Sequence, residues 1–276
     1  MNNQTVSSRA VQRDVVSYRQ SQSLSRSDLV TTEDPLEIRL HGQAIAVIMR
    51  TPLDDFDLAA GFLLTEGIII GPNQLGTISY CKEADPPNLE NIIEVSLTDD
   101  VDFDFDRLKR NFYASSSCGV CGKASIDHIE TQAPPLSDGD FSLSAETIYG
   151  LSDTLRAQQQ VFDKTGSLHA AGLFDINGQL LELREDVGRH NAVDKLFGSF
   201  VLRGQLPPTK TLLMVSGRTS FEIVQKARMA GISMVAAVSA PSSLAVDLAI
   251  EAGMTLVGFL RDRSFNTYSG IHRIQQ

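Results

Sequence analysis

Two cysteines three positions apart, Cys118 and Cys121, carry the most distinctive chemistry in this sequence. A Cys-x-x-Cys pair can bind a metal, cycle between dithiol and disulfide, or carry sulfur as a persulfide. Three serines precede the pair and a glycine follows each cysteine, so the loop is uncrowded and a sulfur atom in it can reach different partners. The neighbouring Lys123 would stabilise a thiolate over a thiol. The loop favours sulfur or redox chemistry, with metal binding and inert thiols as alternatives.

A zinc site at this pair would need two further ligands, because structural zinc is four-coordinate. His128 and Cys81 are the conceivable candidates, but neither has the spacing of a ligand pair, so we expect no bound metal. Zinc-dependent base deaminases combine His-x-Glu with a later Pro-Cys-x-x-Cys. Here His-Ile-Glu (128–130) follows the cysteines, and no proline precedes Cys118. We therefore do not expect a hydrolytic zinc site.

Four short segments rich in glycine, hydroxyl and arginine side chains each follow an apolar run that predicts a β-strand. Ligands of open α/β sheets bind beyond the carboxyl ends of the strands, where helix N-termini favour anions and arginine can grip a phosphate. Ser, Thr and Asp also serve as ordinary helix N-caps, so only the arginines exceed what capping requires. The four segments are Asp186–Asn191, Ser216–Ser220, Ser239–Ser243 and Arg261–Ser264.

Three of these segments supply the anion-binding candidates. They are Gly188, Arg189, His190, Ser216, Gly217, Arg218 and Thr219, together with the arginines of 261–264. The type of a histidine alone does not show that it is catalytic, although imidazole suits proton transfer near neutral pH. His190 is equally typical of a helix-cap region, and His169 of the start of a strand.

Alternating apolar residues over 36–49, around His41-Gly42, predict a hairpin. An acidic first turn and an apolar stripe predict a helix from about residue 54 that Gly67 ends. Strand patterns at 77–80 and 92–97 follow, so the first hundred residues read as mixed α and β.

A regular alternation of strands and helices begins near residue 141. The pattern predicts helices over 145–158, 191–201, 221–229 and 244–251, and strands over 169–175, 179–185, 211–215, 234–239 and 255–260. Asn177-Gly178 is a strong hairpin signal between the first two strands. Such β-α-β units favour a mostly parallel sheet that helices cover on both faces.

The composition excludes several classes of protein. The 276 residues include 24 basic and 34 acidic side chains, a formal net charge of −10. Such a chain is a poor binder of nucleic-acid backbone, although a local pocket can still bind an anion. No apolar run is long enough to span a membrane. With three cysteines and no apolar leader we expect a cytoplasmic protein with reduced thiols.

The pattern divides the chain into three parts. Residues 1–30 are expected to form a loose polar arm, 31–135 a smaller α+β domain that ends in the cysteine loop, and 141–276 the α/β domain. The arginines and serines of the arm also overlap with the composition of a transit peptide.

Four strings of the sequence resemble the formate dehydrogenase accessory sulfurtransferase family, FdhD. They are Ser-Ser-Cys-Gly-Val-Cys-Gly (116–122), Gly-Ser-Leu-His-Ala-Ala-Gly-Leu-Phe (166–174), Arg-Glu-Asp-Val-Gly-Arg-His-Asn-Ala-Val-Asp-Lys (184–195) and Ser-Gly-Arg-Thr-Ser-Phe-Glu (216–222). The resemblance extends from about residue 35 onward, and the string at 184–195 is the most specific of the four.

The resemblance implies a fold, a reaction and partners. The fold is a cytidine-deaminase-like three-layer α/β core, a mixed sheet with helices on both faces, plus a smaller α+β N-terminal part. The implied reaction takes sulfur from a cysteine desulfurase as a persulfide. It then passes the sulfur to the molybdenum cofactor, bis-molybdopterin guanine dinucleotide, before insertion into formate dehydrogenase. A homodimer is also implied.

The resemblance also assigns residues. Cys118 is the implied persulfide carrier and Cys121 the assisting thiol, while a cofactor-contacting segment maps to Phe259, Leu260, Arg261, Asp262, Arg263 and Ser264. GDP is expected to bind as a fragment of the cofactor. The alternative is a non-catalytic chaperone that binds the cofactor and has a structural zinc or an inert cysteine pair.

Overall fold

The hairpin expected over 36–49 is present in the computed structural model, which describes residues 9–84, 86, 88–99, 101, 133, 136 and 141–275. Strands β3 (Asp34–Leu40) and β4 (Gln43–Arg50) are joined by His41 and Gly42, whose φ angles are 48° and 79°. Two positive φ angles give the turn a twist that matches the strands. With β5 (Leu75–Tyr80) and β6 (Ile92–Leu97), the hairpin forms a four-stranded sheet in the order β4-β3-β6-β5.

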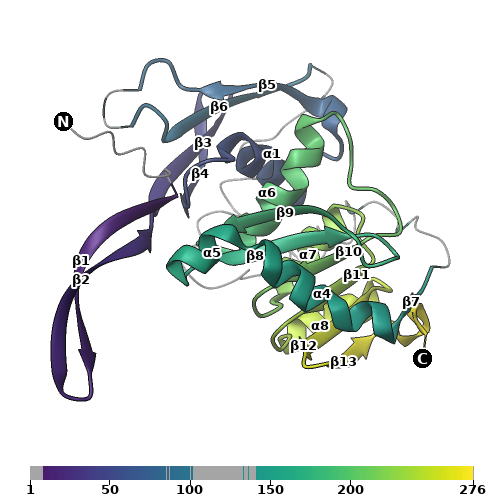
Figure 1. Ribbon diagram of the computed structural model, residues 1–276. Helices are drawn as coiled ribbons and strands as arrows, with labels where there is room; N and C mark the ends of the chain where they lie inside the picture. Colours follow the sequence, from purple (N-terminus) through teal and green to yellow (C-terminus); the bar gives the residue numbers. More distant parts are fainter. Residues whose placement is uncertain are drawn as a thin grey trace.

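The helix expected after Asp54 is α1 (Asp55–Thr65). Its buried residues, which include Leu58, Phe62 and Leu63, lie on several sides of the helix. A helix buried all round must have neighbours on opposite faces. Figure 1 shows why: α1 lies between the four-stranded sheet and α6 (Arg189–Leu202).

A six-stranded mixed sheet forms the centre of the second half of the chain. Its order is β13-β12-β11-β10-β8-β9, and only β10, β11 and β12 are mutually parallel neighbours. The sequence predicts a mostly parallel sheet, and this is right for the centre but not for the pairs at either side, which are antiparallel. The strands are β8 (His169–Phe174), β9 (Leu180–Asp186), β10 (Leu212–Val215), β11 (Met234–Ala237), β12 (Thr255–Arg261) and β13 (Ser264–Ser269).

Helices cover both faces of this sheet, which confirms the α/β class (Figure 1). Helix α4 (Ala145–Gln158) begins at Ser144, whose side chain accepts a hydrogen bond from the Thr147 amide as an N-cap should. Its apolar residues pack on one face. Helices α6, α7 (Phe221–Met229) and α8 (Ser243–Glu251) contribute to the core on the other. The finer cytidine-deaminase-like arrangement stays a prediction.

The two halves of the chain share one hydrophobic core. Leu36, Leu63 and Ile93 from the first half belong to the same buried cluster as Phe197 and Val235 from the second. The expected boundary falls within residues 132–140, most of which lie outside the described residues. The division at 31–135 and 141–276 stays a prediction, but the described parts of these two ranges are packed together rather than joined only by a linker.

Helices α1 and α6 cross at a pair of glycines. A Cβ built on Gly61 would lie 1.8 Å from the Asp194 carbonyl oxygen, and one on Gly198 would lie 1.8 Å from the Asp57 carbonyl oxygen. No real side chain tolerates such a distance, so only glycine lets the two backbones approach this closely. This crossing sets the distance between α1, which packs against the four-stranded sheet, and the α/β core.

From Ala10 onward the N-terminal arm forms a paired hairpin, which corrects the expectation of a loose arm for these residues. Strands β1 (Ala10–Arg19) and β2 (Gln22–Thr31) pair over their full length, and the ribbon projects from the body (Figure 1). Arg9 and Thr31 hold its base through Asp54, Thr165 and Ser167. The segment contains few alternating apolar residues because most of its surface stays exposed, so the usual strand signal is absent.

Several short elements are not predicted from the sequence. They are α5 (Gln160–Thr165), β7 (Leu143–Ser144), β14 (Ile274–Gln275), and the 3-10 turns η1 (Pro72–Gln74) and η2 (Ile271–Arg273). β13 is also new, since the sequence marks 261–264 only as a loop. Among the described residues, no helix combines the length and apolar character that crossing a bilayer requires.

Substituting Gly198→Ala should destabilise the fold by about 3 kcal/mol or more, because the new methyl group would overlap the α1 backbone. The matched control is Gly150→Ala in the exposed part of α4, where nothing lies within 4 Å of the added carbon. That change should stabilise by about 0.5–1 kcal/mol, since alanine favours helix over glycine. Urea unfolding measures both values; equal effects of the two changes would contradict the proposed backbone crossing.

Lys195→Met should lower the free energy of unfolding by about 3–5 kcal/mol, because it leaves the fully buried Asp186 carboxylate without its ion-pair partner. Asp163→Asn is the control, since Asp163 pairs with Arg156 at the exposed surface and such pairs contribute about 1 kcal/mol at most. Denaturant midpoints at constant slope would check the comparison. Similar losses in the two variants would refute the importance of the buried pair.

Candidate functional site

The four candidate segments lie at one edge of the six-stranded sheet. β9 and β10 each pair antiparallel with β8, so they run in the same direction, and β11 and β12 run parallel to β10. The carboxyl ends of these four strands therefore share an edge, as the sequence predicts. Because β8 runs the other way, its first residue, His169, joins them there. This is the edge at which α/β sheets bind ligands.

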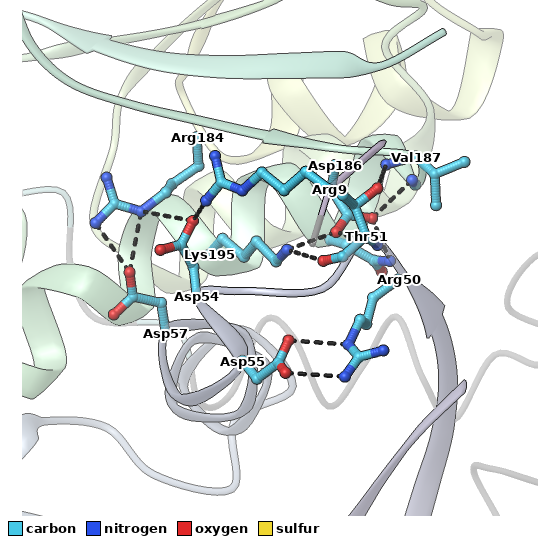
Figure 2. Close-up of polar contacts among 12 residues, drawn as sticks. Arg9, Arg50, Thr51, Asp54, Asp55, Asp57, Arg184, Asp186, Val187 and Lys195 are labelled. Carbon is cyan, nitrogen blue, oxygen red and sulfur yellow. Dashed lines mark hydrogen bonds and ion pairs between the residues drawn. The ribbon is translucent and has the colours of Figure 1, made fainter. Parts of the chain in front are cut away.

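The first residue of the first segment, Asp186, locks that segment in place. Asp186, at the end of β9, accepts hydrogen bonds from the amides of Thr51 and Gly188 at 3.0 and 2.8 Å. Its ion pair with Lys195 measures 2.8 Å, and Lys195 also donates to the Thr51 carbonyl at 2.7 Å (Figure 2). Asn191 completes the set by donating to Asp186 at 2.8 Å. The carboxylate thus fixes the exact position at which α6 begins.

The specific string at 184–195 therefore has two roles. Arg184 pairs with Asp57 at 2.9 Å, and Asp194 accepts a hydrogen bond from the Thr65 hydroxyl at 2.6 Å, so both hold the two halves of the chain together. Arg189 is different. It begins α6, no side chain caps that helix, and the buried Nε of Arg189 has no hydrogen-bond partner among the described residues. An unpaired donor at an open helix N-terminus is the arrangement that receives an anion.

The second segment is tied to β8 and to the third segment. Ser216 exchanges two hydrogen bonds with the backbone of Ala170, at 2.9 and 3.0 Å, and this brings Gly217 against the His169 ring. The Thr219 backbone bonds to Ala240 and Ser242. The Thr219 side chain is 1% exposed, and its hydroxyl has no partner within the described residues.

His190 and Glu222 contact each other between α6 and the first turn of α7. The distance from His190 Nε2 to Glu222 Oε2 is 2.8 Å, and this contact holds the pKa of Glu222 below its ordinary value. Ser220, the N-cap residue of α7, lies 3.1 Å from the same imidazole nitrogen and makes no side-chain cap. The N-terminus of α7 thus keeps amide donors that no side chain occupies.

The segment 259–264 divides between this edge and another surface. Phe259 sits at a bulge with φ of 55° and is 37% exposed, whereas Leu260 is buried. Asp262 and Arg263 form the two-residue turn between Arg261 and Ser264. Arg263 pairs with Glu146 on α4 and lies over the Tyr149 ring, so its charge already has a partner.

A cavity of about 520 Å³ opens beside this edge, between α4, α5 and the strand ends. Its wall includes the predicted residues Ser216, Leu260 and Arg261, and also His169, which the sequence does not identify as a site residue. His169 lies in one of the family-like strings, but its type and position alone are equally typical of an ordinary strand residue. Burial, reinforced by the charges of Arg189 and His190, lowers the pKa of His169.

The arrangement can bind an anion. Arg218 is exposed and, like Arg189 and Arg261, has no acidic partner within the described part of the chain. Two open helix N-termini and an unpaired buried hydroxyl add neutral donors. Arginine pairs with phosphate through two parallel hydrogen bonds, so these residues fit a phosphate-bearing ligand.

The cysteine pair, Cys118 and Cys121, lies outside the described residues. Cys81 is described: it is a partly buried free thiol, and its amide donates to the Ile92 carbonyl directly after β5. The described residues contain no group of three or more metal-ligating side chains that could hold an ion.

Comparisons with known proteins give similarity over almost the whole chain. The FdhD/NarQ family model matches residues 31–275. The chain is 53% identical to the sulfur carrier protein FdhD of Streptomyces avermitilis over 266 residues, which cover 95% of this chain and 94% of that protein. It is 46% identical to the protein of the same name from Mycobacterium tuberculosis over 259 residues, covering 92% and 94%.

A solved structure is similar over nearly its whole length. It is a Desulfotalea psychrophila protein described as a formate dehydrogenase accessory protein, with a TM-score of 0.76 and 26% identity, and the match covers 96% of this chain and 99% of that one. The family model and the identities of about one half extend over both halves of the fold and all four candidate segments. The chain therefore belongs to the FdhD/NarQ family.

Proposed function

We propose that this protein is a sulfur carrier that serves the maturation of formate dehydrogenase. Sulfur moves from a cysteine desulfurase to Cys118 as a persulfide, and then to the molybdenum of the bis-molybdopterin guanine dinucleotide cofactor. The names of the relatives, sulfur carrier protein and formate dehydrogenase accessory protein, support the coarse role. Formate dehydrogenase is the recipient of the modified cofactor in this proposal.

One observation supports the cofactor part of the proposal most strongly. Arg189, Arg218 and Arg261 belong to three different strand ends at one sheet edge, beside a cavity of about 520 Å³. The guanine nucleotide ends of the cofactor carry pyrophosphates, which need several positive charges and amide donors at once. The cofactor is substrate here, so the edge would hold it while sulfur is transferred.

The sulfur step needs only an accessible thiolate. The Cys118 thiolate attacks the outer, sulfane sulfur of the desulfurase persulfide, the bond between the two donor sulfurs breaks, and the desulfurase cysteine leaves as a thiolate. No net oxidation occurs, because the sulfane sulfur passes from one cysteine to another. Cys121 assists by accepting the sulfur or by helping to release it from Cys118. In the release, the Cys121 thiolate attacks the Cys118 sulfur, the bond to the sulfane sulfur breaks, and hydrosulfide leaves for the metal while a Cys118–Cys121 disulfide forms and supplies the two electrons. A homodimer in the cytoplasm completes the proposal.

Cys118→Ala should abolish loading by a cysteine desulfurase supplied with free cysteine, because the acceptor thiol is gone. Intact-protein mass spectrometry would detect the gain of one sulfur in the unmodified chain. Cys81→Ala is the control and should load normally, since that thiol has no small-residue loop around it. Normal loading of Cys118→Ala with loss in Cys81→Ala would overturn the assignment. One zinc per chain that disappears in Cys121→Ala would instead favour the non-catalytic chaperone.

Arg218→Ala should weaken GDP binding about ten- to a hundredfold, since a hydrogen bond to a charged group contributes about 1.5–3 kcal/mol. Calorimetry would measure this, and added salt should weaken binding further. Arg19→Ala, at the exposed end of β1, should leave the affinity unchanged. Persulfide formation should persist in Arg218→Ala. Unaltered GDP affinity in both Arg189→Ala and Arg218→Ala would reject this edge as the nucleotide site.

A further inference from the structure

The wall of the 520 Å³ cavity holds His169, a histidine to which neither the sequence analysis nor the sulfur chemistry assigns a role. His169 begins β8 and pairs in register with Asp186 of β9. On its other side, the double hydrogen bond between Ser216 and Ala170 holds Gly217 so close that a Cβ there would lie 3.2 Å from His169 Nδ1. The ring is therefore held between two candidate segments, with the cavity before it.

The charges around His169 are mostly positive. The charged and titratable groups that face it or share its cavity come from α4, β9, α6, the loop after β10 and β12, and they are Asp153, Arg156, Asp186, Arg189, His190, Arg218 and Arg261. Of the two acids, Asp186 already shares its charge with Lys195 at 2.8 Å, and Asp153 is exposed at the rim. Arg156 is paired with Asp163 and His190 contacts Glu222, so Arg189, Arg218 and Arg261 are the positive groups that have no acidic partner within the described residues. A proton added to His169 would meet repulsion that the present neighbours do not cancel.

An anion bound beside the His169 ring would reverse this balance. A phosphate near Arg189, Arg218 and the ring neutralises the repulsion and can accept a hydrogen bond from an imidazolium. Resting on the proposed function, we propose that His169 contacts the phosphate-bearing ligand, and that the site takes up one proton, at His169, when that ligand binds. The proton comes from solvent and forms one N–H bond, with no redox change.

The direction of the pH dependence follows from linkage. Burial and the neighbouring positive charges hold the pKa of His169 below its ordinary value in the empty site, and a bound phosphate raises it. The complex then binds more protons than the free protein between the two pKa values, so affinity rises as pH falls through that interval. Because His169 is neutral in the empty site, it adds no further positive charge beside the arginines of the site.

Calorimetry with GDP in two buffers of different ionisation enthalpy measures the proton uptake directly. At about pH 7 the unmodified protein should take up a fraction of a proton that disappears in His169→Gln and persists in His272→Gln, an exposed histidine of η2. The terminal phosphate of GDP titrates near pH 6 in all three proteins, so the difference between variants isolates the histidine. His169→Gln should weaken binding about tenfold at pH 6 and little at pH 8.

A second measurement uses the unmodified protein alone. The assigned imidazole resonance of His169, followed by NMR against pH, should show a higher pKa when GDP is present. Proton uptake and affinity that are unchanged in His169→Gln, or a His169 titration that GDP does not move, would overturn the inference while the nucleotide site stands. Absence of GDP binding to the unmodified protein at every pH would instead reject the nucleotide site itself.

Discussion

The buried ion pair between Asp186 and Lys195 is the interaction on which the rest of the structure depends. Both side chains are fully buried, and the Asp186 carboxylate accepts from the Lys195 ammonium and the Thr51 backbone amide (Figure 2). It also accepts from the Asn191 side-chain amide and the Gly188 backbone amide, which makes four donors. Thr51 belongs to the first half of the chain, and Gly188 caps α6. One carboxylate therefore joins the two halves and fixes the helix N-terminus at the candidate site. A buried charge is costly unless it is paired and hydrogen-bonded in this way.

The close packing of α1 against α6 also holds the two halves of the chain together. Gly61 and Gly198 let the backbones touch, and Asp194, directly opposite Gly61, forms a buried ion pair with Lys226 of α7 at 3.0 Å. Thr65 of α1 donates to that same carboxylate at 2.6 Å. Three helices thus meet through backbone contact and one shared acid. Because α6 and α7 both present their N-termini to the candidate site, this junction also makes the site rigid.

The candidate site shows how an acidic chain can offer a positive surface. The net charge of −10 governs solubility and long-range attraction, whereas binding depends on the groups within a few ångströms. At the sheet edge two buried or half-buried acids already have partners, Asp186 with Lys195 and Glu222 with His190. Arg189, Arg218 and Arg261 have no such partners within the described residues, so their charge remains available to a ligand. The sign of the electrostatic potential at the site therefore depends on which acids already have partners, and not on the number of basic residues.

The sequence alone determined most of the elements, because buried strands and amphipathic helices repeat their apolar residues at 2.0 and 3.6 positions. It also determined that four loops lie at one sheet edge, but not the β1–β2 ribbon, whose exposed strands lack that signal. The roles within 184–195 were decided only by the tertiary structure. Asn191, Asp194, Lys195 and Gly198 form one helical stripe of polar and small residues that reads as a solvated face. It is buried because α1, more than a hundred residues earlier, packs against it, and this leaves Arg189 and His190 at the site.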